Sequence, residues 1–337
     1  MFAQAEAHGS ELQAAGVKPI GPISLEDIRA ARKRIERAVL RTPLVRLNVD
    51  DAPTEIYLKL ENLQPFGSFK VRGAGNAIAL ADPTTLVNGV YTASAGNMAQ
   101  GLAFVARQYG LECSVIVPDN SPETKLAAIK RLKCRIIKVP YDTWWNVVLE
   151  HRYAGMEARF IHPVSDPSVI AGNGTIGLEI LADLPDVDAI VIPYGGGGLS
   201  CGIASAVKAL KPTTKIYACE VETASPLAVS LAAGSPQTIN HRPSFVDGIG
   251  GKSLLPEMWP LVSKLLDGSL VVSLREVASA VKLLIERNRV VAEGAGAASL
   301  AAALSTKAGT GKIVCIISGG NIDAAKLITI LSGEVPG

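Results

Sequence analysis

Short runs rich in β-branched residues alternate with helical patterns along most of the chain, and this alternation restricts its fold more than any other feature. Parallel strands need crossover connections, and helices usually supply them. The pattern predicts two series of elements: strand 90–93, helix 97–109, strand 113–117, helix 122–132 and strand 135–139, then helix 168–184 and strands 189–193, 215–220 and 312–317. The sequence therefore predicts an α/β fold with parallel sheets.

The length of 337 residues exceeds the usual size of one domain and predicts either two domains or one large α/β unit with a deep core. Between the two series, Pro163 and Pro167 mark a segment expected to cross from one domain to the other. We expect an N-terminal tail at 1–22, a small domain at 89–165, and a large domain made of 23–88 and 166–337. The tail lacks the basic start and apolar stretch of a secretory signal.

Charge and metal-binding residue types exclude several classes of function. Lys and Arg number 33 against 31 Asp and Glu, so no long-range field attracts nucleic acid or an anionic membrane. The four histidines form no sequence pattern typical of zinc, and the five cysteines form no CxxC pair. We expect buried, reduced thiols, a cytoplasmic location and a small-molecule partner.

The turn Tyr194-Gly195-Gly196-Gly197-Gly198-Leu199 follows a predicted strand and precedes a helical pattern. Glycines in that place leave backbone N–H groups free to converge on an anion at a helix N-terminus. The spacing matches neither a dinucleotide fingerprint nor a nucleoside-triphosphate loop. Taken alone, the run is as consistent with a tight turn as with an anion site.

Lys70 lies among small and apolar residues in the segment 67–74, at the start of a helical pattern. A lysine in such surroundings can have a lowered pKa and react as an amine with an aldehyde. An isolated lysine there is more often a surface residue. Two further turns follow predicted strands, Ser94-Ala95-Gly96-Asn97 and Ser318-Gly319-Gly320-Asn321. Each is consistent with an anion site that acts together with Lys70 or with an ordinary turn.

Taken together and in this order, SFK at 68–70, SAGN at 94–97, GGGGL at 195–199 and SGGN at 318–321 resemble motifs of one family. They are similar to the fold-type II pyridoxal-phosphate (PLP) enzymes, specifically the serine/threonine dehydratase and serine racemase family. RTPL at 41–44 and AGNGTIGLEI at 171–180 extend the resemblance over about 24–330. It implies a fold like that of tryptophan synthase β: two open parallel-sheet domains with helices on both faces, the large domain binding PLP, in a homodimer.

The resemblance also implies roles for individual residues. Lys70 would carry PLP and act as the catalytic base, and Phe69 would lie against the cofactor ring. Asn97 would hydrogen-bond the ring 3′ oxygen, and Ser318 would meet the pyridine nitrogen. The remaining contacts would hold the phosphate (Gly195, Gly196, Gly197, Gly198 and Leu199) and receive the substrate carboxylate (Ser94, Ala95, Gly96, Asn97 and Met98).

The implied reaction is α,β-elimination: a β-hydroxy-α-amino acid loses water and yields a 2-oxo acid and ammonia. A hydroxyl such as Ser318 cannot keep the ring nitrogen protonated as a carboxylate would, and that suits elimination. The expected substrates are threonine, serine or a bulkier analogue such as phenylserine. Alternatives are a β-replacement enzyme of the cysteine synthase type, a serine racemase-like enzyme, and a dehydratase in hydroxylated compatible-solute breakdown.

Three positions depart from the family pattern. Met98 stands where relatives usually have histidine, so we expect the pocket to accept a bulkier or less polar side chain. Ala95 replaces the hydroxyl with which racemases protonate the second face, so little racemisation is expected. Metal-binding relatives use a segment that here keeps Glu220 and Ala224 but has Pro226 in place of aspartate, so no metal is expected. Asp247 and Glu293 also resemble positions that line the site.

Overall fold

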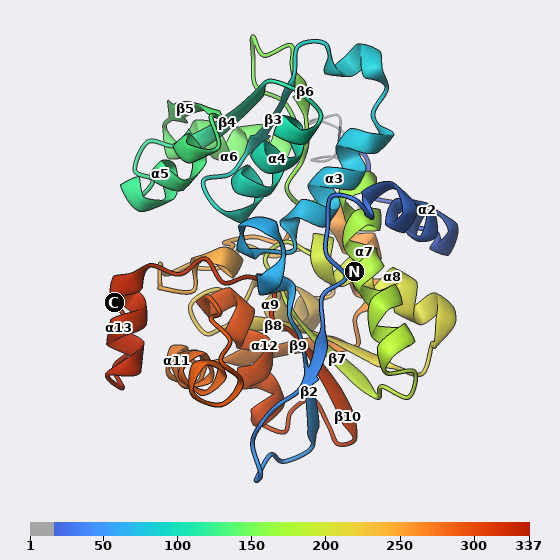
Figure 1. The fold of residues 1–337 in the computed structure, drawn as a ribbon, viewed down its shortest axis with the longest axis vertical. Helices are drawn as coiled ribbons and strands as arrows, with labels where there is room; N and C mark the ends of the chain where they lie inside the picture. The colour runs from blue at the N-terminus through green and yellow to red at the C-terminus, as the bar shows by residue number, and fades with distance from the viewer. Residues whose placement is uncertain (1–16) are drawn as a thin grey trace.

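The computed structural model describes residues 17–337, which are organised around two sheets (Figure 1). The larger sheet has six strands in the order β1-β2-β10-β7-β8-β9, and the smaller has four in the order β5-β4-β3-β6. The strands are β1 (Leu44–Arg46), β2 (Glu55–Lys59), β3 (Val90–Ala93), β4 (Cys113–Pro118), β5 (Arg135–Val139), β6 (Arg159–Phe160), β7 (Ala189–Pro193), β8 (Lys215–Val221), β9 (Gly268–Val272) and β10 (Lys312–Ile316).

Helices connect the strands and cover the sheets. They are α2 (Leu25–Ile35), α3 (Lys70–Leu80), α4 (Asn97–Gln108), α5 (Glu123–Arg131), α6 (Tyr141–Glu150), α7 (Pro167–Asp183), α8 (Gly198–Leu210), α9 (Pro226–Ala233), α10 (Trp259–Leu265), α11 (Leu274–Leu283), α12 (Gly294–Leu304) and α13 (Ala324–Leu331). A π-helical turn, Leu284–Asn288, extends α11. In Figure 1, α4, α5 and α6 surround the smaller sheet above, and α3 lies near the junction with the larger sheet.

Alternate residues of the large sheet pack into two separate apolar clusters. Ile190 and Ile192 of β7 contact the cluster that contains α7 and α8, whereas Ala189 and Val191 face α11 and α12. A strand alternates its side chains between faces, so a sheet covered on both sides is apolar throughout. This accounts for the uninterrupted apolar sequence AIVIP and confirms the prediction of helices on both faces.

The structure differs from the sequence-based prediction in three details. β1 runs antiparallel to β2 at the edge of an otherwise parallel sheet. The sequence pattern predicts helices over 25–39 and 200–210, whereas α2 ends at Ile35 and α8 begins at Gly198, directly after Gly197 with φ +101°. The tail predicted at 1–22 falls for the most part outside the described residues.

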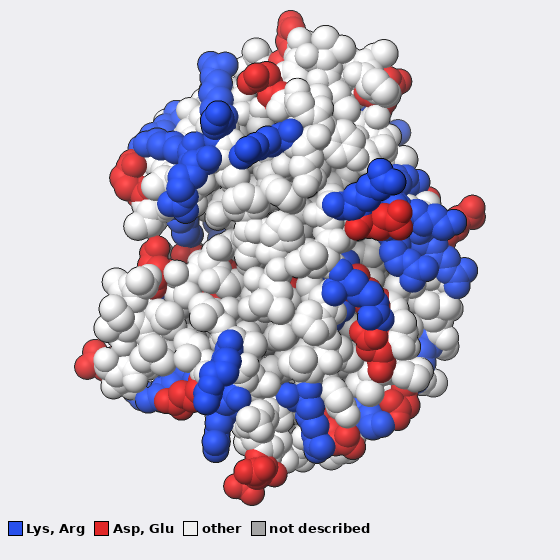
Figure 2. Space-filling model, viewed as in Figure 1, with Lys and Arg blue, Asp and Glu red and all other residues white. Residues whose placement is uncertain are grey.

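Charges of both signs are interspersed on the face shown in Figure 2, including the basic residues over α2. This distribution agrees with the small net charge and offers no extended field of one sign on that face. Between residues 17 and 337, no helix combines the length and apolarity needed to cross a membrane. The five cysteines are all buried and unbridged.

Candidate active site

One cavity of about 580 Å³ opens where strands of both sheets end. Its size is that of a small-molecule binding site. The turns after β3 and β7 and the segment after β10 all reach it, as expected at the carboxyl ends of parallel strands. All the residues for which the sequence predicted cofactor or substrate contacts line it: Phe69, Lys70, Ser94, Ala95, Gly96, Asn97, Met98, Gly195, Gly196, Gly197, Gly198, Leu199 and Ser318.

Lys70 begins α3, and an unusual backbone turn places it there. Phe66 and Gly67 have φ of 58° and 72°, in the left-handed region. A side chain at Gly67 would also approach Asn321 Oδ1 within 2.9 Å. The Phe69 N–H then donates to the Ser318 carbonyl at 3.1 Å, so the lysine segment is fixed against the segment after β10.

The Lys70 amine is half-buried and faces the cavity. Its Nζ donates to the carbonyl of Pro163 at 2.7 Å and lies 5.1 Å from the centroid of the Phe69 ring. Burial lowers the pKa of this amine to about 8, although the nearby Glu293 carboxylate opposes the shift. About a tenth of the lysine is therefore neutral, and nucleophilic, at pH 7, far more than for an exposed lysine.

The glycine turn presents free donors to the same cavity. The N–H groups from Gly195 to Ser200 have no hydrogen-bond acceptor among the described residues. They surround the N-terminus of α8, where the helix dipole adds favourable potential for an anion. A Cβ at Gly196 would lie 2.9 Å from Val164 Cγ1, so this position has no room for a side chain. The turn can hold a phosphate or carboxylate group.

Asn97 joins two of the motifs by direct contacts. Its Nδ2 donates to Glu293 Oε1 at 2.7 Å, and its Oδ1 accepts from Asn321 Nδ2 at 2.8 Å. One Nδ2 proton stays available for a ligand. The Ser318 hydroxyl, although the residue is only 4% exposed, has no hydrogen-bond partner among residues 17–337. Both side chains can therefore donate into the cavity.

Glu293 is the site residue whose importance the sequence indicated least. It precedes α12, touches Asn97, and is packed so tightly that a Cβ at Gly319 would lie 2.5 Å from its Oε1. Burial raises its pKa to about 7, and the nearby Asp247 adds to the shift. Asp247 itself pairs with Lys125 of α5 at 2.9 Å, and both residues line the cavity. Only family resemblance singled out these two acids.

Met98 and Glu220 contribute differently from the motif residues. Met98 is 1% exposed and packs in the apolar cluster of α3, α4 and the small sheet, so it forms part of an apolar wall. Glu220 accepts hydrogen bonds from the N–H groups of Leu227 and Ala228, both at 2.8 Å, and from Ser269 at 2.7 Å. Its carboxylate oxygens thus cap α9. Ala224 follows, with its N–H bonded to the carbonyl of Val221.

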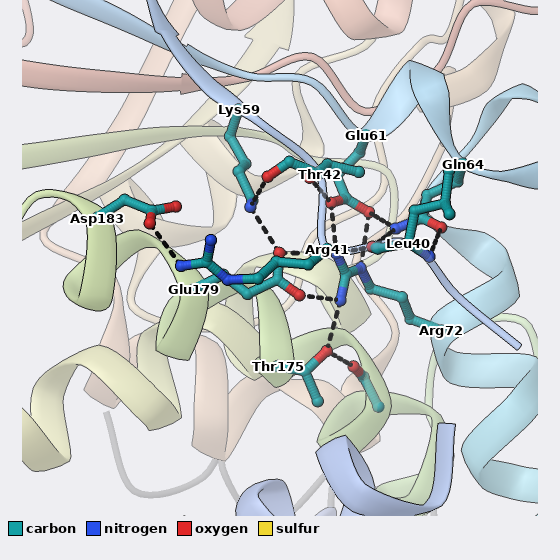
Figure 3. A network of polar contacts seen from close by, with 11 residues as sticks. Leu40, Arg41, Thr42, Lys59, Glu61, Gln64, Arg72, Thr175, Glu179 and Asp183 are labelled. Carbon is teal, nitrogen blue, oxygen red and sulfur yellow. Dashed lines mark hydrogen bonds and ion pairs between the residues drawn. The ribbon is translucent and has the colours of Figure 1, made fainter. Parts of the chain in front are cut away.

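Two motifs that gave no site residue, RTPL and AGNGTIGLEI, meet in a buried ion network (Figure 3). Arg72, on α3 close to Lys70, binds Glu61 and Glu179 through two nitrogens each, at 2.7–3.0 Å. Lys59 pairs with Glu179 at 2.5 Å. Two positive and two negative groups are at most 7% exposed and balance in charge, which their burial requires. The network ties the helix that begins at Lys70 to β2 and α7.

The pKa of Glu293 gives a testable pH dependence. In the unfolded chain its pKa is about 4.3, so the folded protein holds an extra proton between that value and about 7. The associated stability is fully present below about pH 4.3 and is lost as pH rises through about 7. We expect Glu293→Gln to remove about 2–3 kcal/mol of the decrease in stability between pH 5 and 8.

Urea unfolding of the apoprotein at pH 5 and pH 8 measures this difference. Glu36→Gln, at an exposed position just after α2, is the matched control and should keep the pH dependence of the wild type. Parallel stability-against-pH curves for the wild type and Glu293→Gln would contradict the expectation.

Comparisons with known proteins agree with this arrangement. The family model described as pyridoxal-phosphate dependent enzyme matches residues 35–319. The L-threonine ammonia-lyase of Thermotoga maritima is 40% identical over 315 residues, which cover 92% of this chain and 78% of the relative. The catabolic L-threonine dehydratase TdcB of Escherichia coli K12 is 37% identical, covering 92% and 96%. The crystal structure of serine racemase from Dictyostelium discoideum superposes with a TM-score of 0.81 at 35% identity, covering 89% of this chain and 99% of that one.

Proposed function

The chain belongs to the pyridoxal-phosphate dependent enzymes, and from that premise we propose that it is an ammonia-lyase (dehydratase) acting on a β-hydroxy-α-amino acid. The products are a 2-oxo acid and ammonia. The observation that carries the proposal is a nucleophilic amine, Lys70, in one cavity with the glycine turn, whose N–H donors have no acceptor between residues 17 and 337.

The donor set fits the cofactor. An amine with lowered pKa suits an aldehyde, and free N–H groups at a helix N-terminus suit a phosphate. We assign the covalent link to Lys70, the phosphate contacts to Gly195–Leu199, a ring contact to Phe69, and polar ring contacts to Asn97 and Ser318. When bound, pyridoxal phosphate supplies a covalent link to the substrate amine and a ring that withdraws electrons from Cα.

Residues of the chain itself bind the substrate and move its protons. Lys70, neutral above about pH 8, takes the proton from Cα as general base. The turn from Ser94 to Met98 opens α4 and offers N–H groups to the substrate carboxylate. Ser318 donates or accepts one hydrogen bond and adds no charge, so it does not keep the ring nitrogen protonated. The ring then withdraws electrons less strongly, which favours their departure with the β-hydroxyl. The apolar wall at Met98 supports threonine or a bulkier substrate as well as serine.

A single assay tests the proposed reaction. Purified holoenzyme is incubated with L-threonine, L-serine or L-threo-phenylserine, and the 2-oxo acid is measured. Formation of 2-oxo acid and ammonia in equal amounts from at least one of these is expected. A product that forms only when a thiol nucleophile is added would instead indicate β-replacement, and no reaction with any of the three would contradict the proposal.

We expect elimination with little racemisation, because Ala95 offers no proton donor on the face of Cα opposite Lys70. Racemisation needs a base on each face, whereas elimination needs only Lys70 and an acid for the leaving group. L-Serine is incubated in deuterium oxide, and D-serine and pyruvate are followed. D-Serine formation at least about 100-fold slower than pyruvate formation is expected. Comparable rates would contradict this view, and Ala95→Ser should raise the D-serine rate.

The proposal also covers organisation and location. We propose a homodimer in the cytoplasm, with a small domain at 89–165 and a large PLP-binding domain at 23–88 and 166–337. The domain division is supported by the two separate sheets, and the location by the five buried, unbridged cysteines. Sedimentation equilibrium gives the oligomeric state.

A further inference from the structure

A buried turn, residues 162–165, lies directly behind Lys70. It connects β6 to α7, and its Pro163 carbonyl accepts the hydrogen bond from Lys70 Nζ at 2.7 Å. Two side chains of the turn, His162 and Ser165, are 2% and 3% exposed. The sequence identified this segment only as a crossing between domains.

The hydrogen bonds of His162 define which of its nitrogens carries the proton. Nδ1 accepts from the N–H groups of Val164 at 3.1 Å and Ser165 at 2.6 Å, so it has no proton of its own. The proton is therefore on Nε2, which donates to the carbonyl of Val148 at 3.1 Å. Burial, together with the neighbouring His151 and Lys70, holds the pKa of His162 well below its usual range. The imidazole stays neutral.

Peptide geometry transmits this contact to Lys70. The carbonyl of Pro163 and the N–H of Val164 belong to one planar peptide unit and point in opposite directions. When His162 Nδ1 fixes the Val164 N–H, it also fixes the direction of the carbonyl that accepts from Lys70 Nζ. Proline adds stiffness because its φ is locked and the residue before it is restricted to extended backbone.

The same turn contacts the glycine turn that we assign to the phosphate. A Cβ at Gly198 would lie 2.7 Å from the Val164 carbonyl oxygen, and one at Gly196 would meet the Val164 side chain at 2.9 Å. Residues 162–165 thus touch both the amine and the anion cradle. The placement of residues 162–165 therefore sets the position of the Lys70 amine relative to the glycine turn.

The surroundings of His162 argue against a metal site. His151, His162 and Glu257 place ligand atoms within 4.8 Å of one another, and the two rings stack with centroids 4.3 Å apart. The sequence shows no zinc-type pattern of histidines, and these two rings are brought together by the fold. Both nitrogens of His162 are nevertheless bound to backbone groups, so it has no free lone pair for a cation. Ser165 Oγ donates to Glu257 at 2.8 Å and completes the cluster.

We propose that His162 is a positioning residue: as a neutral imidazole it fixes the Pro163–Val164 peptide, so that the Pro163 carbonyl orients the amine of Lys70. This inference rests on the proposed role of Lys70 as the cofactor anchor. It predicts that altering His162 changes the reactivity of Lys70 and not merely the stability of the fold.

The test measures how fast the apoprotein captures pyridoxal phosphate, followed by visible absorbance, beside kcat and KM. His162→Leu should slow capture and lower kcat by about tenfold or more, with KM little changed, because a misplaced amine reacts slowly. His162→Asn should recover most of both rates, since an asparagine oxygen can accept from N–H groups two and three residues later. Ser165→Ala, which disturbs the same cluster without freeing the peptide, should keep the wild-type capture rate.

The proposal would be overturned if the wild type and a folded His162→Leu variant captured pyridoxal phosphate at equal rates. It would also be overturned if His162→Asn captured the cofactor as slowly as His162→Leu. If the Leu variant does not fold, His162→Gln replaces it: its oxygen lies one bond farther out, and a Gln rate equal to the Asn rate would contradict the positioning role. Covalent capture by Lys70→Ala would refute the anchor itself, so the two failures are distinguishable.

Discussion

Turnover is expected to fall by about 10⁴-fold or more in Lys70→Ala, because one amine serves both as covalent anchor and as general base. Of the side chains around the cavity, only that of Lys70 donates to Pro163 and starts α3 beside the Ser318 segment. The variant should stay folded, since removing a half-buried amine whose pKa is already lowered to about 8 leaves no buried charge unpaired. Product formation by the wild type and Lys70→Ala measures the loss of turnover, and circular dichroism of both shows whether the variant is folded.

Lys125→Ala serves as the matched control for Lys70→Ala. Lys125 also lines the cavity, but its ammonium pairs with Asp247 at 2.9 Å. The Lys125→Ala variant should retain covalent cofactor binding. Residual turnover of Lys70→Ala above a few per cent of wild type would indicate that another group removes the α-proton.

Arg72→Met should give the largest loss of stability, about 3–5 kcal/mol, because it leaves Glu61 and Glu179 buried with a single remaining cation. The methionine fills much of the volume but donates none of the hydrogen bonds that the guanidinium makes to both carboxylates. Burial alone would lower the pKa of Arg72 and raise that of Glu61, but the opposite charges and the hydrogen bonds between them outweigh it, so the pKa of Arg72 is raised and that of Glu61 is lowered. Urea unfolding of the apoprotein measures the change.

Arg41→Met is the control within the same region. Arg41 pairs with Asp183 at 2.5 Å (Figure 3). Its side chain is 60% exposed, so its loss should cost less than about 1 kcal/mol. Similar losses for the two variants would show that the network around Arg72 contributes no more than a surface ion pair.

The alternation of strand and helix patterns in the sequence predicted much of the fold, because local sequence patterns determine where these elements lie. β7 has the predicted bounds, and α4, β4, α5 and α7 agree to within a residue at each end. Errors arose where tertiary contacts override local pattern. Helix α2 ends at Ile35, and the residues after it form a turn that leads to Leu40, whose N–H and carbonyl both hydrogen-bond to the side chain of Gln64, far along the chain.

The motifs located the candidate site, whereas their supporting contacts could not be predicted. Glycine turns and an activated lysine have local signatures. The stacking of His151 on His162, the bond from Lys70 to Pro163, and the contact of Asn97 with Glu293 join segments that only the fold brings together. RTPL and AGNGTIGLEI were visible as motifs, but their shared purpose in the Arg72 network required the structure.

The most direct test of the account is to reduce the holoenzyme with borohydride, digest it, and locate the phosphopyridoxyl group by mass spectrometry. The account predicts the label on Lys70 in the peptide that contains SFKVR, in close to one equivalent per chain, and its loss after incubation with L-threonine or L-serine before reduction. A stoichiometric label on any other lysine, with Lys70 unmodified, would contradict it.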